Sequence, residues 1–404
     1  MSEIPTVTAA DVESARTMLE GVSILTPMEE SRWLSQRAGG EVRLKCENLQ
    51  RTGSFKIRGA YVRIARLTEE ERAHGVVAAS AGNHAQGVAL AARLLGIKST
   101  VFMPEGAPIP KEKATRAYGA DVVFHGRYID QALIAAQEFA DRTGAVLIHP
   151  FDHEDIVAGQ GTAGLEILEQ SPGVRTVLVP TGGGGLVAGI ATAIKAKRPD
   201  VRIVGVQAEG ASTFGASLAK GAPVALQSMQ TMADGIAVGC PGEVPFKAVQ
   251  EYVDDIITVS EESMSRALLS LVERAKMVVE PAGAVAVAAV LDHPDAFETP
   301  AVAVLSGGNI DPLLLGKVIR HGMASASRYL NLRVCIPDTP GGLAHLLTQL
   351  AEAQANVLEV AHERISPSLL LDEVEVQVQV ETRGKEHAAT LLSMLRERGY
   401  RVYE

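Results

Sequence analysis

The sequence TVLVPTGGGGLVAGIATAIKAK, residues Thr176–Lys197, combines a short apolar run, four consecutive glycines and a helix-length segment. The run Thr176–Val179 predicts a buried strand, and Leu186–Lys197 predicts a helix. Because the strand ends at Pro180, the glycines form the turn between the two elements. A strand, a glycine turn and a helix in this order are typical of α/β proteins.

The same alternation extends along most of the chain on both sides of this stretch. The expected strand and helix pairs are Gly75–Ala79 with Asn83–Leu95, Ser99–Met103 with Lys111–Tyr118, Asp121–His125 with Asp130–Arg142, and Ala145–His149 with Gly161–Glu169. Further strands are expected at Val201–Gln207 and Ala301–Leu305, the latter followed by a helix from about Asp311. Short apolar runs separated by helices predict a parallel sheet that is covered on both faces.

Residues 331–404 show a different pattern, in which strands alternate strictly between apolar and polar side chains. The expected elements are a strand at Asn331–Asp338, a helix at Gly342–Ala353, two strands of which the second carries Val374, Val376, Val378 and Val380, a helix at Lys385–Arg398 and a strand at Tyr400–Tyr403. A period of two means one buried and one exposed face. The order βαββαβ predicts a ferredoxin-like domain, joined to the rest by His321–Tyr329.

Composition and charge exclude several classes of protein. The formal net charge of −10 argues against nucleic-acid binding, which needs clustered lysines and arginines. Cys46, Cys240 and Cys335 are far apart and lack metal-ligand spacing, so isolated thiols in a reducing compartment are expected. No apolar stretch is long enough to span a membrane. Met1–Asp11 lacks the basic start and apolar run of a signal peptide, so a cytoplasmic protein is expected.

The glycine run Gly182–Gly185 is suited to bind a phosphate. Residues without Cβ let the backbone turn tightly and direct several N–H groups to one point, and the following helix N-terminus adds a partial positive charge. A tight turn without a ligand remains the alternative. The pattern Gly183, Gly185, Ala188 also fits G-x-G-x-x-A, with Glu209 ending the next strand. An NAD-dependent oxidoreductase therefore stays open at this point.

Ser54–Ala60, SFKIRGA, places Lys56 between two apolar side chains, just after the polar turn Gln50–Gly53. Burial disfavours the charged ammonium and lowers the pKa of a lysine. Such an amine can form an imine with an aldehyde, which is how pyridoxal phosphate is held in enzymes. An exposed lysine whose stem covers apolar surface is the alternative.

Two more polar turns follow predicted strands. Ser80–Gly87, SAGNHAQG, offers a helix N-terminus for a carboxylate and the amide of Asn83 for a ring hydroxyl, although helix capping would explain Ser80 or Asn83 equally well. Ser306–Asn309, SGGN, follows the strand near residue 305. Because open α/β sheets bind ligands at the carboxyl ends of their strands, three such turns and a lysine predict one shared site.

Taken together, five motifs resemble those of the threonine dehydratases, which belong to the tryptophan-synthase-β-like class of pyridoxal-phosphate enzymes. The motifs are Ser54–Ala60, Ser80–Gly87, Gly182–Leu186, Thr231–Val238 and Ser306–Asn309. The resemblance covers roughly Thr6–Tyr329 and implies a two-lobed parallel-sheet fold. It implies a catalytic domain over residues 1–325, whose smaller lobe, about residues 55–150, is inserted in the larger one.

The resemblance also implies roles for individual residues. Lys56 would carry pyridoxal 5'-phosphate as a Schiff base and later remove the Cα proton of the substrate. The other cofactor contacts implied are Phe55 against the cofactor, Asn83 at the ring hydroxyl, Gly182, Gly183, Gly184, Gly185 and Leu186 at the phosphate, and Ser306 at the pyridine nitrogen. The substrate contacts implied are Ser80, Ala81, Gly82 and His84 at the carboxylate, with Asp234 and Gly235 lining the pocket.

The activity implied is deamination of L-threonine to 2-oxobutanoate and ammonia by β-elimination of the hydroxyl. L-Serine is expected to react as well, since one methyl group gives little discrimination. A serine or hydroxyaspartate dehydratase on the same scaffold is the alternative, and a non-catalytic amino-acid sensor is a third hypothesis.

Two departures from related families refine this expectation. Serine racemases place a serine, the acid for the opposite face, where this chain has Ala81, and alanine has no proton to give. The cation site of that family matches only at Glu209, because its second acidic position is Gly215 here, and no metal is predicted. Glu280 is expected either to shape the cofactor pocket or to form a structural salt bridge.

The C-terminal region resembles an ACT domain. The matching stretches are Asp338–Leu343, Ala355–Val357 and Arg398–Tyr400. The resemblance implies an amino-acid effector near Pro340–Leu343 at an interface between subunits of a homo-oligomer, a dimer or a tetramer. Isoleucine or valine is the expected effector, because 2-oxobutanoate feeds isoleucine synthesis. A domain that serves only oligomerisation is the alternative.

Overall fold

The chain forms two compact units. The computed structural model describes residues 6–364, 369 and 372–403. The two units are Met1–Pro312 and Leu313–Glu404, so the boundary falls after the first residue of helix α14 (Pro312–Ser325), earlier than the join expected at His321–Tyr329. The expected absence of a signal peptide rests partly on residues 1–5, which lie outside the described residues. In the described part of the chain, no helix is both long and apolar enough to cross a membrane.

The larger sheet of the first unit has six strands, in the order β1-β2-β10-β7-β8-β9. Their bounds are β1 (Met28–Glu30), β2 (Val42–Lys45), β10 (Ala301–Val304), β7 (Thr176–Pro180), β8 (Arg202–Ala208) and β9 (Asp255–Val259). All neighbours are parallel except the β1–β2 pair. A parallel sheet, as the alternation of strands and helices predicted, is thereby confirmed.

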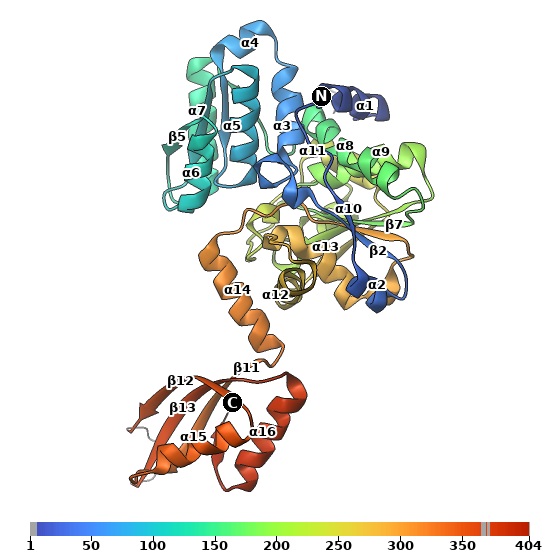
Figure 1. Ribbon diagram of the computed structural model, residues 1–404. Helices are drawn as coiled ribbons and strands as arrows, with labels where there is room; N and C mark the ends of the chain where they lie inside the picture. Colours follow the sequence, from blue (N-terminus) through green and yellow to red (C-terminus); the bar gives the residue numbers. More distant parts are fainter. Residues whose placement is uncertain (1–5, 365–368, 370–371, 404) are drawn as a thin grey trace. The chain divides into compact units, whose positions relative to one another are not determined.

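The smaller sheet has four parallel strands, in the order β5-β4-β3-β6. They are β5 (Asp121–Phe124), β4 (Ser99–Met103), β3 (Val76–Ala79) and β6 (Val146–Leu147), and in the chain they fall between β2 and β7 of the larger sheet. Helices α5 (Asn83–Leu95), α6 (Ile109–Ala117) and α7 (Ile129–Thr143) lie in the same lobe as β5, whereas β2, β7 and α13 (Pro281–Asp292) lie in the other (Figure 1).

The core of the larger lobe is made by apolar side chains of β7, β8 and β10 together with α1 (Ala9–Met18), α8 (Glu154–Gln170), α9 (Gly185–Lys197) and α11 (Glu243–Tyr252). The other helices of this unit are α2 (Arg32–Ala38), α3 (Lys56–Ala65), α4 (Glu69–His74), α10 (Thr213–Lys220) and α12 (Glu261–Ser270). Short 3-10 turns occur at Glu47–Leu49, Arg51–Gly53, Glu209–Ala211, Asp234–Ile236 and Pro294–Ala296, and a π-helical turn at Leu271–Ala275.

Helix α8 is longer than predicted, because it begins at Glu154 rather than near Gly161. Its glycines look like helix breakers in the sequence, but each meets a neighbouring backbone. A Cβ on Gly159 would lie 2.6 Å from the Cα of Gly59 in α3, and a Cβ on Gly161 would lie 2.8 Å from the carbonyl oxygen of Gly189 in α9. Glycine therefore permits close helix packing here, which the local propensity of the residue conceals.

Helix α3 is held in place by a buried charge network. The Arg58 side chain is fully buried and forms ion pairs with Glu47 at 2.8 Å and Glu166 at 2.7 Å. Lys45, also buried, pairs with Glu166 at 2.6 Å. Two cations and two carboxylates thus offset one another away from water, two residues after the start of α3 at Lys56.

The second unit has a four-stranded antiparallel sheet in the order β12-β13-β11-β14. The elements are α14, β11 (Tyr329–Pro337), α15 (Gly342–Glu352), β12 (Asn356–Glu363), β13 (Glu373–Glu381), α16 (Lys385–Glu397) and β14 (Arg401–Tyr403). After α14, the βαββαβ order matches the predicted ferredoxin-like arrangement. Valines of β13 and leucines of α15 and α16 form the core, but Glu375 is buried too, against the predicted alternation.

We predict that Arg58→Met lowers the free energy of unfolding by about 3–5 kcal/mol, because it leaves the carboxylates of Glu47 and Glu166 without their shared cation. Urea unfolding followed by circular dichroism measures the change. The control is Arg16→Met, whose ion pair with Glu169 is exposed and should be worth less than about 1 kcal/mol. Equal effects of the two variants would contradict the role given to the buried network.

Candidate active site

The loop that carries Lys56 is fastened to the turn that follows β10. Ser54 and Gly307 form an antiparallel bridge, and the Phe55 backbone N–H donates to the Ser306 carbonyl at 3.2 Å. The Gly308 N–H donates to the carbonyl of Gly53 at 2.8 Å. Two of the motifs found in the sequence are thereby fixed to each other by main-chain hydrogen bonds, at the carboxyl edge of the larger sheet.

The amine of Lys56 is partly buried at the wall of a cavity. Its Nζ donates to the carbonyl oxygen of Pro150 at 2.9 Å and lies 5.1 Å from the centre of the Phe55 ring. Burial lowers the pKa of Lys56 from 10.5 to about 8, although the nearby carboxyl group of Glu280 opposes this change. A larger fraction of this amine is therefore neutral near pH 7 than of an ordinary lysine.

The glycine run lies at the N-terminus of α9, as predicted. Gly184 is the N-cap residue, with a φ of 99°, and no side chain caps the helix. A Cβ on Gly183 would lie 2.5 Å from the ring of Phe151, and one on Gly182 would lie 2.9 Å from the Cα of Ile236. Close packing and the positive φ both require glycine, and the backbone N–H groups at the start of α9 are left for an anion.

The side chain of Asn83 lies between the carboxyl group of Glu280 and the amide of Asn309. Its Nδ2 donates to Glu280 Oε1 at 2.6 Å, and its Oδ1 accepts from Asn309 Nδ2 at 2.9 Å. Asn309 also donates to the carbonyl of Thr52 at 2.6 Å, next to the lysine loop. Glu280 is almost completely buried, and burial followed by the charge of Asp234 raises its pKa to about 7. Of the two roles expected for Glu280, the structure favours shaping of the pocket.

The turn before α5 presents backbone rather than side-chain donors. Gly82 is the N-cap of α5 and has no side-chain cap, so neither Ser80 nor Asn83 caps this helix. The hydroxyl of Ser80 instead accepts from the Gly82 N–H at 3.1 Å. His84 Nε2 donates to the carbonyl of Ile148 at 2.7 Å, and burial lowers the pKa of this imidazole to about 3. The side chain of His84 is thus neutral and bound to the protein itself.

All the residues predicted from the sequence line one cavity of about 490 Å³ in the first unit. They are Phe55, Lys56, Ser80, Ala81, Gly82, Asn83, His84, Gly182, Gly183, Gly184, Gly185, Leu186, Asp234, Gly235 and Ser306. The sequence did not point to other lining residues, among them Lys111, Pro150, Phe151 and Gln160. Lys111 forms an ion pair with Asp234 at 2.6 Å, and nothing in its local sequence distinguishes it from an exposed helix lysine.

The side chains present fit pyridoxal phosphate. A cavity of this volume is within the usual range for a cofactor site. It holds a desolvated amine for the aldehyde, an uncapped helix N-terminus for the phosphate and a nearly buried Ser306 hydroxyl. Within residues 6–364, 369 and 372–403, no three His, Cys, Asp or Glu side chains come together as a metal site.

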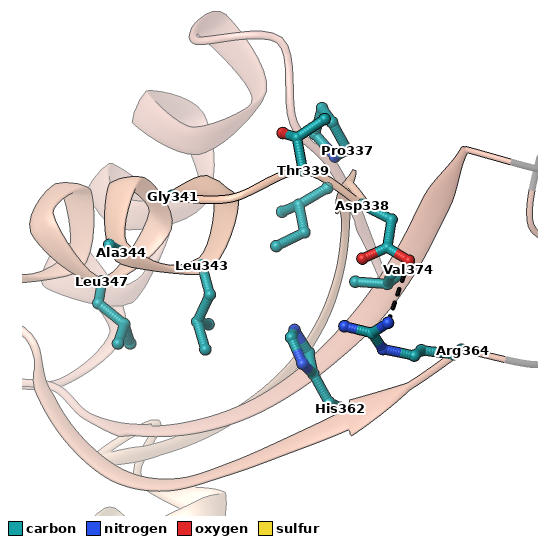
Figure 2. A pocket seen from close by; sticks show the side chains of 11 residues that line it. Pro337, Asp338, Thr339, Gly341, Leu343, Ala344, Leu347, His362, Arg364 and Val374 are labelled. Atoms are coloured by element: carbon teal, nitrogen blue, oxygen red, sulfur yellow. Dashed lines mark hydrogen bonds and ion pairs between the residues drawn. The ribbon is translucent and has the colours of Figure 1, made fainter.

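A second cavity, of about 360 Å³, lies in the C-terminal unit beside the turn between β11 and α15. Figure 2 shows Leu343 and Leu347 of α15 on one side, and His362 and Arg364, at the end of β12, on the other. Arg364 forms an ion pair with Asp338 at 3.3 Å. The cavity therefore combines an apolar wall with a cation, at the turn where the sequence predicted an effector.

We predict that Lys56 in the cofactor-free protein reacts with acetylating reagents with a midpoint near pH 8, because burial lowers the pKa of its amine. Glu280→Gln should move the midpoint lower still, because the carboxyl group of Glu280 raises this pKa. Peptide mass spectrometry across a pH series gives the rates, with exposed Lys98 as the internal reference. A midpoint near 10.5, or no response to Glu280→Gln, would refute this electrostatic description.

Comparison with known proteins identifies the family. Residues 21–307 match the family described as "Pyridoxal-phosphate dependent enzyme". An L-threonine ammonia-lyase of Thermotoga maritima is 45% identical over 98% of this chain and 99% of its own length. The processed threonine deaminase isoform 2 of Solanum lycopersicum is 37% identical, with a TM-score of 0.75 over 79% of this chain and 91% of its own. Maize serine racemase is 34% identical, with a TM-score of 0.74 over 80% and 99%. This chain belongs to the pyridoxal-phosphate dependent enzymes.

Proposed function

We propose that this protein is a cytoplasmic threonine ammonia-lyase that converts L-threonine to 2-oxobutanoate and ammonia. One observation carries the proposal: a lysine whose pKa is lowered to about 8 shares a cavity with an uncapped helix N-terminus made of glycines. The similarity to an L-threonine ammonia-lyase along 98% of the chain supports the choice of reaction. The family match removes the support for an NAD-dependent oxidoreductase, which rested on the glycine pattern alone.

Pyridoxal phosphate, when bound, supplies an electron sink that acidifies the Cα proton of the amino acid. Lys56 receives that proton at Nζ, because its lowered pKa leaves part of the amine neutral near pH 7. The carbonyl of Pro150 accepts a hydrogen bond from Nζ and keeps the amine inside the cavity. Gly182–Gly185 hold the phosphate through backbone N–H groups at the start of α9.

Ser306 and Asn83 hold the cofactor ring. A serine hydroxyl cannot keep the pyridine nitrogen protonated as a carboxylate would, so the ring is a weaker electron sink and elimination is favoured over slower side reactions. The amide of Asn83 is oriented by Glu280 on one side and Asn309 on the other. Its remaining N–H is therefore available for the ring hydroxyl.

The expected preference among substrates and reactions depends on the methyl group of threonine and on Ala81. L-Serine lacks one methyl group of threonine, a difference worth only about 10–200-fold in kcat/KM, so it remains a slower substrate. Ala81 lines the cavity and has no proton to deliver to the opposite face of Cα, which disfavours racemisation. A serine or hydroxyaspartate dehydratase on the same scaffold is the second candidate.

We predict that Lys56→Ala lowers the rate of 2-oxobutanoate formation by about 10²–10⁴-fold, because the base is removed. The same variant should lose the absorbance of covalently held cofactor. Lys98→Ala, at an exposed position, is the matched control and should retain both properties. Full activity of Lys56→Ala would exclude the mechanism, and a wild-type protein that makes no 2-oxo acid from threonine would exclude the function.

We infer that the C-terminal unit is an ACT-like regulatory domain of a homo-oligomer and binds isoleucine or valine. The second cavity supports this, since Leu343 and Leu347 suit an aliphatic side chain and Arg364 suits a carboxylate. Regulation requires that the bound effector favour one conformational state of the enzyme over another.

We predict that Arg364→Ala weakens isoleucine binding by about tenfold or more, through the loss of a charge-assisted hydrogen bond to the carboxylate. Calorimetric titration of the full chain provides the dissociation constants. Arg383→Ala is the control, because Arg383 lies in the same unit but does not line the cavity. If neither isoleucine nor valine binds the wild-type protein, the unit does not serve as their sensor.

A further inference from the structure

Lys111 is a nearly buried cation in the active-site cavity to which the proposed reaction assigns no role. It belongs to α6 of the smaller lobe, and its side chain is 9% exposed. Its partner Asp234 comes from the larger lobe and is 59% exposed. A carboxylate so open to water is easily solvated on its own, whereas the ammonium depends on whatever anion lies in the cavity.

The ammonium of Lys111 faces the turn before α5. A Cβ built on Gly82 would lie 4.0 Å from Lys111 Nζ. Gly82 is the N-cap of the 13-residue helix α5, and no side chain caps that end. A full positive charge and the partial positive charge of a helix N-terminus therefore lie side by side in the cavity.

The donors of this pair exceed the acceptors that the structure supplies. An ammonium has three N–H donors, and among the residues that the structure describes Lys111 Nζ has one acceptor, Asp234 Oδ2 at 2.6 Å. The hydroxyl of Ser80 accepts from the Gly82 N–H and is not aimed at the lysine. Two ammonium donors and the first N–H groups of α5 thus remain for an anion from solution.

We propose that Lys111 binds the α-carboxylate of the amino-acid substrate, together with the backbone N–H groups at the start of α5. Asp234 is its partner in the absence of substrate and keeps the ammonium directed at the turn. This assignment rests on the proposed function, because it identifies the group that orients the same substrate. The ammonium of Lys111 also offsets whatever negative charge the buried carboxyl group of Glu280 carries in the same cavity, and so favours an anionic substrate.

Separate substitutions of Lys111 and Asp234 distinguish a contact with the substrate from an ion pair that only stabilises the structure. Lys111→Met keeps the aliphatic stem and leaves only the exposed Asp234 without a partner, so this variant should fold. Asp234→Asn keeps the ammonium but removes its counter-ion. If the ion pair only stabilised the structure, Asp234→Asn would have the greater effect on folding and activity, because it leaves the buried ammonium of Lys111 without a counter-ion.

The experiment measures kcat, KM and cofactor absorbance of the full-length holoenzyme for Lys111→Met, Asp234→Asn and the control Lys113→Met, an exposed lysine of the same helix. We expect KM for threonine to rise about tenfold or more in Lys111→Met, by loss of a charge-assisted hydrogen bond, with cofactor absorbance unchanged. Asp234→Asn should raise KM less than Lys111→Met does, because it keeps the ammonium that binds the carboxylate, and Lys113→Met should match wild type. An unchanged KM in Lys111→Met, or an equal rise in both pair variants, overturns the proposal.

L-Threoninamide, which lacks the carboxylate charge, provides a second measurement. Its inhibition constant should exceed KM for threonine in the wild-type enzyme, and the ratio should fall toward one in Lys111→Met. A ratio that is the same in Lys111→Met and in wild type overturns the assignment. It is overturned as well if Lys111→Met weakens the binding of 3-hydroxyaspartate but not of threonine, because Lys111 would then bind the β-carboxylate. Failure of the wild-type enzyme to deaminate threonine refutes the proposed function instead, so the two failures are distinguishable.

Discussion

Desolvation of the Lys56 amine is the constraint on which the site depends. A lysine in water would be almost wholly protonated at neutral pH and would be a poor base and a poor nucleophile. The fold partly buries Nζ, leaves it the Pro150 carbonyl as an acceptor and holds the carboxyl group of Glu280 nearby. Burying an amine costs free energy, and the surrounding structure must supply it.

The surrounding structure fixes the position of the amine through attachments on both sides of Lys56. Helix α3 begins at Lys56, and two residues later Arg58 is fixed by buried carboxylates. The preceding loop is bonded to the turn after β10 through Ser54 and Phe55. The position of the amine is therefore set by the larger sheet as well as by α3. The expected phosphate site at the start of α9 packs closely against the segment that holds the amine. A Cβ on Gly183 would overlap Phe151, and the carbonyl of the preceding residue, Pro150, accepts the hydrogen bond from Lys56 Nζ.

Much of the fold and of the cavity lining could be predicted from the sequence. Apolar runs and glycine turns predict the strands and helices of the α/β region, and ligands bind at the carboxyl ends of such strands. The turn residues indicate where the ligand site lies, because the backbone geometry of a tight turn restricts which residues can occupy it. The prediction of the start of α8 is wrong, because its glycines serve close packing against α3 and α9, which local propensity does not reveal.

The position of Lys111 in the cavity could not be predicted from the sequence for a related reason. A lysine on an amphipathic helix is usually exposed, and only the meeting of α6 with the Asp234 turn buries it. The role of the buried carboxyl group of Glu280 depends on its contact with Asn83, which is 197 residues away in the chain. Long-range contacts of this kind leave no periodicity in the sequence, so the electrostatics of the cavity had to come from the structure.

The most direct test of the central claim is to locate the covalent link between protein and cofactor. The holoenzyme is reduced with borohydride and digested, and the peptide that retains the pyridoxyl group is identified by mass spectrometry. The account predicts that the label is found on Lys56, in the peptide that contains Ser54 and Phe55. A label on another lysine, such as Lys111, or none at all, would contradict it.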